Sequence, residues 1–286
     1  MAEELTVLDV VRKSTDFLDK KGVESPRLNA EWLIAHALGL GRMDLYLQFD
    51  RPLIGEELEQ MRALVARRGK REPLQYIQGQ AQFHDLMLKC DTRALIPRPE
   101  TEQLVEFVKD SGLEIDQNLR ILDLGTGTGA IALALAMNFP RARIVATDAS
   151  QNALDLASEN ALLCGLQNRV EFRLSNWFGS LGGEKRFDLI VSNPPYLTDE
   201  EFAEAESEVK DFEPESALVA NDEGMADLRV IISGSYPLLE KSGTLWLETG
   251  IAQREALLGS CREVGYADSE GLDDWSGRPR FIRAIK

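Results

Sequence analysis

The second half of the chain alternates between short apolar runs and helical patterns, and this alternation restricts the fold more than any other feature. From residue 119 onward, β-branched and apolar runs predict strands, and segments of helical periodicity lie between most of them. Such an order is typical of an α/β fold in which a doubly wound, seven-stranded, mostly parallel sheet carries helices on both faces. The predicted strands are Arg120–Leu124, Arg143–Thr147, Val170–Leu174, Phe187–Ser192, Gly243–Glu248, Tyr266–Ser269 and Arg280–Ile285.

A different pattern precedes this sheet. Apolar residues recur at helical spacing through residues 1–72, and Ser25-Pro26 is a helix-start signal. Between Leu74 and Thr92 the period changes towards two, which predicts a β-hairpin with His84-Asp85 near its turn. We therefore expect a small helical N-terminal domain (residues 1–72), a β-hairpin linker (73–94) and an α/β domain (95–286).

Two charged segments allow more than one interpretation. A predicted helix from Gly55 ends in a basic cluster, which is either a solvated last turn or a contact for phosphate or an acidic surface. An acidic stretch, Asp199–Glu215, is expected to form a long loop with a short helix, and it is either a solvated face or a means of steering a basic partner. The basic cluster consists of Arg67, Arg68, Lys70 and Arg71.

Composition narrows the class of protein. Of the 286 residues, 44% are apolar and 28% are charged, as in globular proteins. No apolar run could span a membrane and the start lacks a secretion signal, so we expect a cytoplasmic protein without membrane contact. The net charge of −16 argues against a protein that grips bare nucleic acid and favours a small molecule or a basic protein as partner. With two histidines and no Cys/His cluster, we expect no metal site.

A strand that runs into a glycine-rich turn indicates a cofactor site. Ile121–Leu124 is followed by Gly125–Gly129, and Ala130–Ala136 continues as a helix. Glycines let the backbone come close to a ligand, and Asp148 closes the next strand, where it can accept both hydroxyls of a ribose. These features predict an adenosine cofactor, and the loose dinucleotide pattern keeps a nicotinamide cofactor open at this point. The predicted cofactor-binding residues here are Gly125, Thr126, Gly127, Thr128, Gly129 and Asp148.

The stretch Asn193-Pro194-Pro195-Tyr196 follows the apolar strand Phe187–Ser192. Proline cannot continue a central strand, so the two prolines end it in a stiff turn, at the strand end where open α/β sheets place their ligands. The Asn193 side-chain oxygen and the Pro194 carbonyl can form a pair of acceptors that holds a planar –NH2 group in one orientation. Tyr196 can lie flat against the same group. The sequence therefore predicts a site for an amino nitrogen.

Two further residues favour S-adenosylmethionine over a nicotinamide cofactor. Asp123, just before the glycines, is poorly placed beside a pyrophosphate and well placed to receive the ammonium of an amino-acid moiety. Trp177 ends the third strand, where it can stack on or flank an adenine, although a core tryptophan is the alternative. Asn193 and its neighbours have no obvious role in hydride transfer.

Together these segments resemble the amino-methylating branch of the class I S-adenosylmethionine-dependent methyltransferases. With Leu95–Glu102 (sequence LIPRPETE) behind a helical unit and a hairpin, the chain closely resembles the HemK/PrmC family of release-factor glutamine methyltransferases. The resemblance implies that residues 95–286 form the catalytic domain and methylate the glutamine side-chain nitrogen in the Gly-Gly-Gln loop of peptide chain release factors. It also implies that the N-terminal domain recognises the release factor, and we expect a monomer. By position, the cofactor would be bound by Gly125–Gly129, Asp148, Trp177 and Asn193. The glutamine would be held by Asn193, Pro194, Pro195 and Tyr196. The catalytic residues would be Asn193, Pro194 and Tyr196.

Other functions stay open from the sequence. A close relative methylates a glutamine of a ribosomal protein, and DNA adenine methyltransferases share the Asn-Pro-Pro-Tyr type of motif. The latter need a nucleic-acid recognition surface, and this acidic chain has no separate domain for one. A protein that keeps the cofactor fold without turnover is the third alternative.

Overall fold

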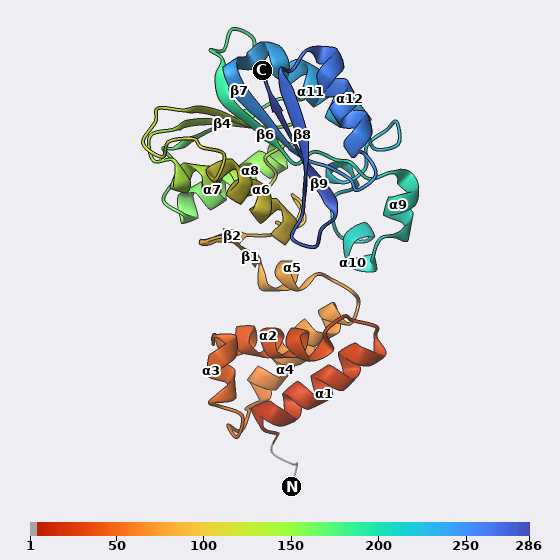
Figure 1. Cartoon of the computed structure of the whole chain (residues 1–286). Coiled ribbons are helices and arrows are strands. Elements are labelled where there is room, and N and C mark those ends of the chain that lie inside the picture. Colours follow the sequence, from red (N-terminus) through yellow and green to blue (C-terminus); the bar gives the residue numbers. More distant parts are fainter. Residues whose placement is uncertain (1–4) are drawn as a thin grey trace. The chain divides into compact units, whose positions relative to one another are not determined.

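The computed structural model describes residues 5–286 of the chain, which form two compact units (Figure 1). The first, here called the helical unit, extends to Gly79 and also contains Glu206–Phe212. The second, the sheet unit, contains Gln80–Ala205 and Glu213–Lys286. The segment that follows Asn193 in the sequence therefore leaves the sheet unit for seven residues and returns to it.

Local sequence signals account for the helices of the helical unit. Thr6 and Asp9 form a capping box at the start of α1, in which each side chain accepts from the backbone N–H of the other residue. Proline at its first position starts α2, and Gly39 ends that helix in the left-handed conformation. Apolar side chains of these helices pack into two small cores. The helices are α1 (Val7–Lys20), α2 (Pro26–Leu38), α3 (Arg42–Tyr46), α4 (Gly55–Arg68), α5 (Leu74–Gln78) and the short α10 (Ser207–Lys210).

The basic cluster after α4 contacts carboxylates of the same unit. Arg68 Nη2 donates to Glu208 Oε1 at 2.8 Å, and Arg71 Nε donates to the same oxygen at 2.7 Å. A second nitrogen of Arg71 donates to Glu206. Although burial acts in the opposite direction, the bonds from Arg71 and Arg68 hold the pKa of Glu208 below its usual range. The predicted contact with an acidic surface is thus confirmed for these two arginines, and that surface belongs to the chain itself.

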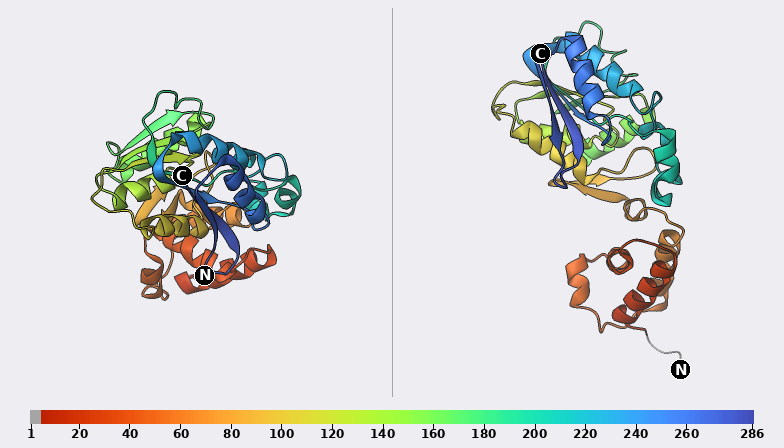
Figure 2. Two further views of the ribbon diagram at one scale, coloured as in Figure 1. Left: turned by 45° about the horizontal axis from the view of Figure 1, so that its top comes forward. Right: turned by 45° about the vertical axis from the view of Figure 1, so that its right-hand side comes forward.

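The sheet unit has strands at its centre and helices around them (Figure 2). The strands form a seven-stranded sheet in the order β5-β4-β3-β6-β7-β9-β8. Neighbours from β5 to β7 are parallel, and β9 runs antiparallel to both β7 and β8. The chain runs outward from β3 to β5 and then returns to β6 on the other side of β3. Such sheets bind ligands at the point where the strand order reverses. The strand order confirms the predicted doubly wound, mostly parallel sheet. The strands are β3 (Arg120–Leu124), β4 (Arg143–Asp148), β5 (Val170–Leu174), β6 (Phe187–Ser192), β7 (Leu239–Glu248), β8 (Asp268–Asp273) and β9 (Pro279–Ile285).

Helices cover both faces of the sheet because the central strands are apolar on both faces. Ile121 and Leu122 are neighbours in β3, both are fully buried, and they belong to different cores. The core around Ile121 includes side chains of α6 (Pro99–Lys109), α7 (Ala130–Asn138) and α8 (Gln151–Leu163). The core around Leu122 includes side chains of α11 (Ala226–Leu238) and α12 (Arg254–Val264).

The predicted hairpin is present, but it begins later than its apolar pattern indicated. Strands β1 (Gln80–Phe83) and β2 (Leu86–Lys89) pair antiparallel, so the turn at His84-Asp85 is confirmed. The strand pattern predicted from Leu74 was wrong there, because Leu74–Gln78 form the short helix α5 between Pro73 and Gly79. The hairpin belongs to the sheet unit.

Other differences from the sequence prediction lie at the start of β7, at an edge and in a loop. Strand β7 begins at Leu239, before the predicted Gly243. The strand expected at Tyr266–Ser269 is β8 (Asp268–Asp273), whose residues are mostly polar and none of which is fully buried. The acidic stretch contains two short helices, α9 (Asp199–Glu204) and α10, and the 3-10 turn η1 (Glu215–Ala217), where one short helix was predicted. Within residues 5–286, none of the helices has the length and apolar character needed to cross a membrane. The predicted domain boundaries at residues 72 and 94 stay a prediction.

Candidate active site

A cavity of about 430 Å³ lies at the carboxyl ends of β3, β4 and β6, and it gathers most of the predicted site residues. A second, smaller cavity of about 50 Å³ adjoins the Asn193 turn (Asn193–Tyr196). Asn193 lines both cavities, as do Leu95, Arg98 and Ala217. Of the predicted residues, the larger cavity is lined by Gly125, Thr126, Gly127, Thr128, Asp148, Trp177, Asn193 and Pro195, and the smaller by Asn193, Pro194 and Tyr196.

The glycine turn (Gly125–Gly129) brings backbone to the floor of the larger cavity. The backbone N–H groups of Gly125 and Thr126 both donate to the Thr147 carbonyl at 2.9 Å, which ties the turn to the end of β4. Gly129 has a φ of +84°, and a Cβ there would press on Ala157 of α8. A side chain at this position would therefore push the turn away from α8. Gly129 itself does not line the cavity.

Asp148 lies at the wall of the larger cavity with its carboxylate held in place. Its Oδ2 accepts from the Gly127 N–H at 2.9 Å and its Oδ1 accepts from the Ser150 N–H at 2.9 Å. Burial raises the pKa of Asp148, while these backbone bonds act against the shift. Each oxygen keeps a second lone pair, so the group can still accept from the hydroxyls of a ligand.

Asp123 lies beneath the glycine turn and does not line the cavity. It is fully buried, and its Oδ2 accepts from the Thr126 hydroxyl at 2.6 Å and from the Ala132 N–H at 3.2 Å. Its Oδ1 has no hydrogen-bond partner among the residues that the structure describes. Burial raises the pKa of Asp123 to about 7. Its predicted contact with an ammonium group stays a prediction.

Trp177 stands at the larger cavity with its indole fixed by a hydrogen bond. The indole N–H donates to Asp227 Oδ1 at 2.9 Å, and both residues line the cavity. The ring lies next to Gly125, so close that a Cβ on this glycine would be in van der Waals contact with it. The indole is therefore part of the cavity wall, and it also packs against the core around Leu122.

The Asn193 turn is fixed by backbone contacts on its downstream side. The N–H groups of Tyr196 and Leu197 both donate to the Leu218 carbonyl, and the Gln253 side chain donates to the Tyr196 carbonyl at 2.9 Å. Gly224 packs so closely on this turn that a Cβ would overlap the Tyr196 carbonyl oxygen. The turn is thus held on more than one side and presents the Asn193 side chain at a defined place.

The side chains of the turn belong to a buried network that the sequence did not predict. Asn193 Nδ2 donates to the Thr101 hydroxyl at 3.0 Å, and this hydroxyl donates to Glu248 Oε2 at 2.7 Å. The Tyr196 hydroxyl donates to Glu248 Oε1 at 3.1 Å, and the Arg280 guanidinium lies 6.0 Å from the Tyr196 ring centre. Burial raises the pKa of both Glu248 and Tyr196.

The segment Ile96–Arg98 beside the larger cavity is anchored by a buried carboxylate. Glu213 accepts from the Ile96 N–H at 3.1 Å and pairs with the Arg98 guanidinium. Ile96 and Arg98 line the larger cavity, as does Pro97 between them. Glu213 belongs to the acidic stretch, so part of this stretch braces the site.

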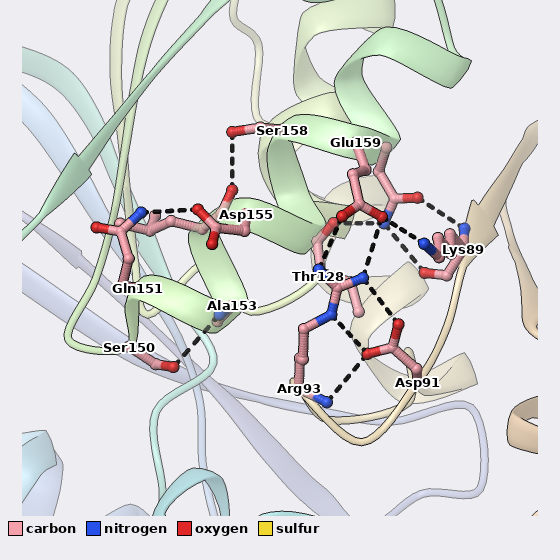
Figure 3. A network of polar contacts seen from close by, with 12 residues as sticks. Lys89, Asp91, Arg93, Thr128, Ser150, Gln151, Ala153, Asp155, Ser158 and Glu159 are labelled. Carbon is pink, nitrogen blue, oxygen red and sulfur yellow. Dashed lines mark hydrogen bonds and ion pairs between the residues drawn. The ribbon is translucent and has the colours of Figure 1, made fainter.

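A second set of polar contacts fastens the chain after the hairpin to α8 (Figure 3). Glu159 pairs with both Lys89 and Arg93, and Arg93 also pairs with Asp91. The buried Asn160 donates to the carbonyls of Lys89 and Thr128. Arg93 lines the larger cavity, so these contacts hold one rim of it.

His84, the histidine nearest to the predicted site, lies outside both cavity linings. Its Nε2 lies 3.0 Å from the Glu102 carbonyl and its Nδ1 lies 3.2 Å from Glu106, both on α6. Within residues 5–286 the structure contains no group of three or more His, Cys, Asp or Glu side chains that could hold a metal ion.

Sequence reasoning missed the residues that act through others. Thr101 stands inside the quoted Leu95–Glu102 segment but was given no role, and Glu248 was visible only as the end of a predicted strand. Asp227 and Arg280 carried no local signal. Each was missed because its partner is distant in sequence: Glu248 lies 147 residues from Thr101.

Comparison with known proteins agrees with this geometry. Residues 9–79 match the family model described as the PrmC N-terminal domain, and residues 101–212 match that of the methyltransferase small domain. The chain is 40% identical over 277 residues to the release factor glutamine methyltransferase of Geobacter sulfurreducens, covering 97% of this chain and 95% of that one. It is 42% identical over 257 residues to the release factor glutamine methyltransferase of Salmonella typhimurium, covering 90% of this chain and 91% of that one.

Solved structures agree on the fold. A methyltransferase from Pyrococcus furiosus superposes with a TM-score of 0.53 and 16% identity, covering 71% of this chain and 90% of that one. The 16S rRNA N2 G1207 methyltransferase of Thermus thermophilus, solved with AdoMet and guanosine, gives a TM-score of 0.53 and 19% identity, covering 72% and 49%.

Proposed function

Because the chain belongs to the family of release factor glutamine methyltransferases, we propose that it methylates the side-chain amide nitrogen (N5) of the glutamine in the Gly-Gly-Gln motif of peptide chain release factors. The methyl donor is S-adenosyl-L-methionine. The observation that carries the proposal is that Asn193 lines both the larger and the smaller cavity. The larger has room for a nucleoside cofactor, and the smaller ends on the polar groups of the Asn193 turn.

The residues of the larger cavity fit S-adenosylmethionine. Asp148 has free lone pairs for ribose hydroxyls, and Trp177 offers an aromatic face for an adenine. Asp123 lies outside the cavity lining, but its Oδ1 has no partner among the described residues, and we propose that the ammonium of the amino-acid moiety reaches it. When bound, the cofactor supplies a methyl group on a positively charged sulfur.

The protein's part in the reaction is to orient the amide and to stabilise charge. An amide nitrogen is a weak nucleophile because its lone pair is delocalised into the carbonyl. Asn193 Oδ1 and the Pro194 carbonyl accept its two N–H bonds and stabilise the positive charge that develops on nitrogen during attack. Preorganised dipoles of this kind contribute about 3 kcal/mol each, and alignment contributes a comparable amount. No histidine lines either cavity, and the amide proton leaves to water after transfer.

The helical unit is the part of the chain that we assign to recognition of the folded release factor. Several large apolar side chains on this unit are exposed, among them Leu47 at 86%, Met43 at 68% and Ile54 at 62%. A protein partner can cover such side chains.

Mass spectrometry of a release factor after incubation with the protein and S-adenosylmethionine tests the proposal. We expect one added methyl on the Gly-Gly-Gln glutamine, and turnover on the order of 100-fold lower for Asn193→Ala with a smaller change in cofactor affinity. Asn118→Ala, at an exposed position with no role in the site, is the matched control. A methyl on a ribosomal-protein glutamine or a nucleic-acid adenine instead would overturn the substrate assignment. Cofactor binding without any methyl transfer would show a non-catalytic protein.

A further inference from the structure

The Asn193 side-chain amide has an acceptor oxygen on one side and a donor –NH2 group on the other. Whether it can accept a hydrogen bond from the substrate amide therefore depends on which side faces the substrate. The proposed mechanism, on which this inference rests, needs the oxygen Oδ1 to face the substrate amide. Rotation of the side chain by half a turn would present Nδ2 instead, and two N–H groups would then oppose each other. Something in the protein must therefore select one orientation.

The buried network of Thr101, Tyr196 and Glu248 selects the orientation of the Asn193 amide, because its hydroxyl protons are already engaged. With Glu248 ionised, both of its oxygens accept, one from the Thr101 hydroxyl and one from the Tyr196 hydroxyl. A threonine hydroxyl has a single proton, and Thr101 gives it to Glu248. Its oxygen is then left with lone pairs only, and towards Asn193 it can accept but not donate.

We infer that Thr101 and Glu248 are positioning residues, which orient the Asn193 side chain with Nδ2 on Thr101 and leave Oδ1 free to accept from the substrate amide. The reversed orientation of Asn193 would place its oxygen against the Thr101 lone pairs with no proton between them. Glu248 does not touch the substrate nitrogen in this account. It acts through Thr101.

The burial of Thr101 and Glu248 and their positions on separate elements stabilise this orientation of Asn193. Thr101 is 5% exposed and Glu248 is 2% exposed, so both hydrogen bonds of the Thr101 hydroxyl lie inside the protein. The three groups come from separate elements: Thr101 from the first turn of α6, Asn193 from the end of β6 and Glu248 from the end of β7. Glu248 and Asn193 also line the smaller cavity, which places the network directly behind the predicted glutamine site.

Two substitutions at Thr101 separate this role from simple packing. Thr101→Val keeps the volume and removes the hydroxyl, whereas Thr101→Ser keeps the hydroxyl and removes the methyl group. We expect kcat to fall on the order of 100-fold for Thr101→Val and to stay within about threefold of wild type for Thr101→Ser. A packing role predicts the opposite order, because valine fills the site and serine leaves a gap.

Glu248→Gln provides a second variant of nearly unchanged shape. Its amide has one acceptor oxygen for the two hydroxyls that both donate to the carboxylate, so either Thr101 or Tyr196 must reverse its bond. We expect kcat to fall about tenfold with little change in cofactor affinity, since the loss of one positioned hydrogen bond has this effect. Glu270→Gln, which changes a glutamate of β8 that pairs with Arg283, is the matched control.

The measurements are kcat and KM on a release factor, the dissociation constant of S-adenosylmethionine by calorimetry, and the melting temperature of each variant. The order Ser above Val in kcat, with both folded, supports the inference. Equal kcat for Val and wild type overturns it, and if Thr101→Val does not fold, wild-type kcat in Glu248→Gln overturns it instead. A wild-type protein that leaves the Gly-Gly-Gln glutamine unmethylated refutes the proposed function, and this outcome is distinguishable because it precedes any comparison of variants.

Discussion

Asp123 is a fully buried carboxyl group whose ionisation should make the stability of the protein depend on pH. Burial raises its pKa to about 7 from 3.8, against the hydrogen bonds from Thr126 and Ala132. A raised pKa means that the folded state holds its proton at pH values where the unfolded chain has lost it. The stabilising effect of that proton is complete below pH 3.8 and is lost as the pH rises through 7. Since one pKa unit corresponds to 1.36 kcal/mol, the full effect is about 4 kcal/mol.

The substitution Asp123→Asn isolates this effect. An asparagine oxygen can still accept from Thr126 and Ala132, but the side chain never ionises. Urea unfolding of the cofactor-free protein at a series of pH values gives the free energy of unfolding of both forms. Between pH 5 and pH 7 we expect the free energy of unfolding of the variant to rise by about 2.5 kcal/mol relative to that of the wild type. This rise corresponds to about two pH units at 1.36 kcal/mol per unit.

Parallel pH profiles for the wild type and Asp123→Asn would refute the reasoning. Asp116→Asn, at an exposed position, serves as the control and should leave the profile of the wild type unchanged. The same titration with saturating S-adenosylmethionine tests the proposed ammonium contact. A bound ammonium beside Asp123 favours the carboxylate, so the pH dependence of the wild type should become flatter.

Two further substitutions test the Asn193 turn and the helical unit. Gly224→Ala places a Cβ against the Tyr196 carbonyl oxygen at a φ of +77°, so we expect a lower melting temperature and turnover reduced on the order of 100-fold. The control is Gly112→Ala, which is strained at a φ of +88° but has open space around it and should keep normal turnover. Leu47→Ser should raise KM for intact release factor about tenfold without affecting a Gly-Gly-Gln peptide. Leu162→Ser on α8 controls for surface polarity alone, and equal effects on protein and peptide would contradict the assignment of the helical unit.

The sequence predicted the centre of the sheet accurately because these strands are defined by local composition. The bounds predicted for the central strands β3 and β6 coincide with those observed, and each strand contains an apolar run that is followed by a glycine or proline turn. The edge strand β8 was displaced because its residues are polar and partly exposed, so no apolar alternation marks it. The helix α5 was taken for a strand because its five residues are too few to show a helical period.

The site was predictable to the extent that its residues lie in continuous motifs. The glycine turn and the Asn193 turn each follow a strand directly, so the parallel sheet brings their ends together once the strand order is known. Glu248 ends a third strand of the same sheet, and sheet register places it beside the Asn193 turn, but a single glutamate after an apolar run carries no signal of its own. Asp227 and Arg280 depend on helix and strand packing that composition does not specify.

The acidic stretch shows why net charge alone misleads about partners. Of its carboxylates, Glu206 and Glu208 pair with Arg68 and Arg71 in the helical unit, and the buried Glu213 pairs with Arg98 at the cavity wall in the sheet unit. Each of these carboxylates lies beside an arginine of the chain, which offsets its charge. The exposed carboxylates of α9 are different, because solvent surrounds them and their potential extends beyond the surface. The predicted steering of a basic partner therefore applies to α9, the helix that follows the Asn193 turn.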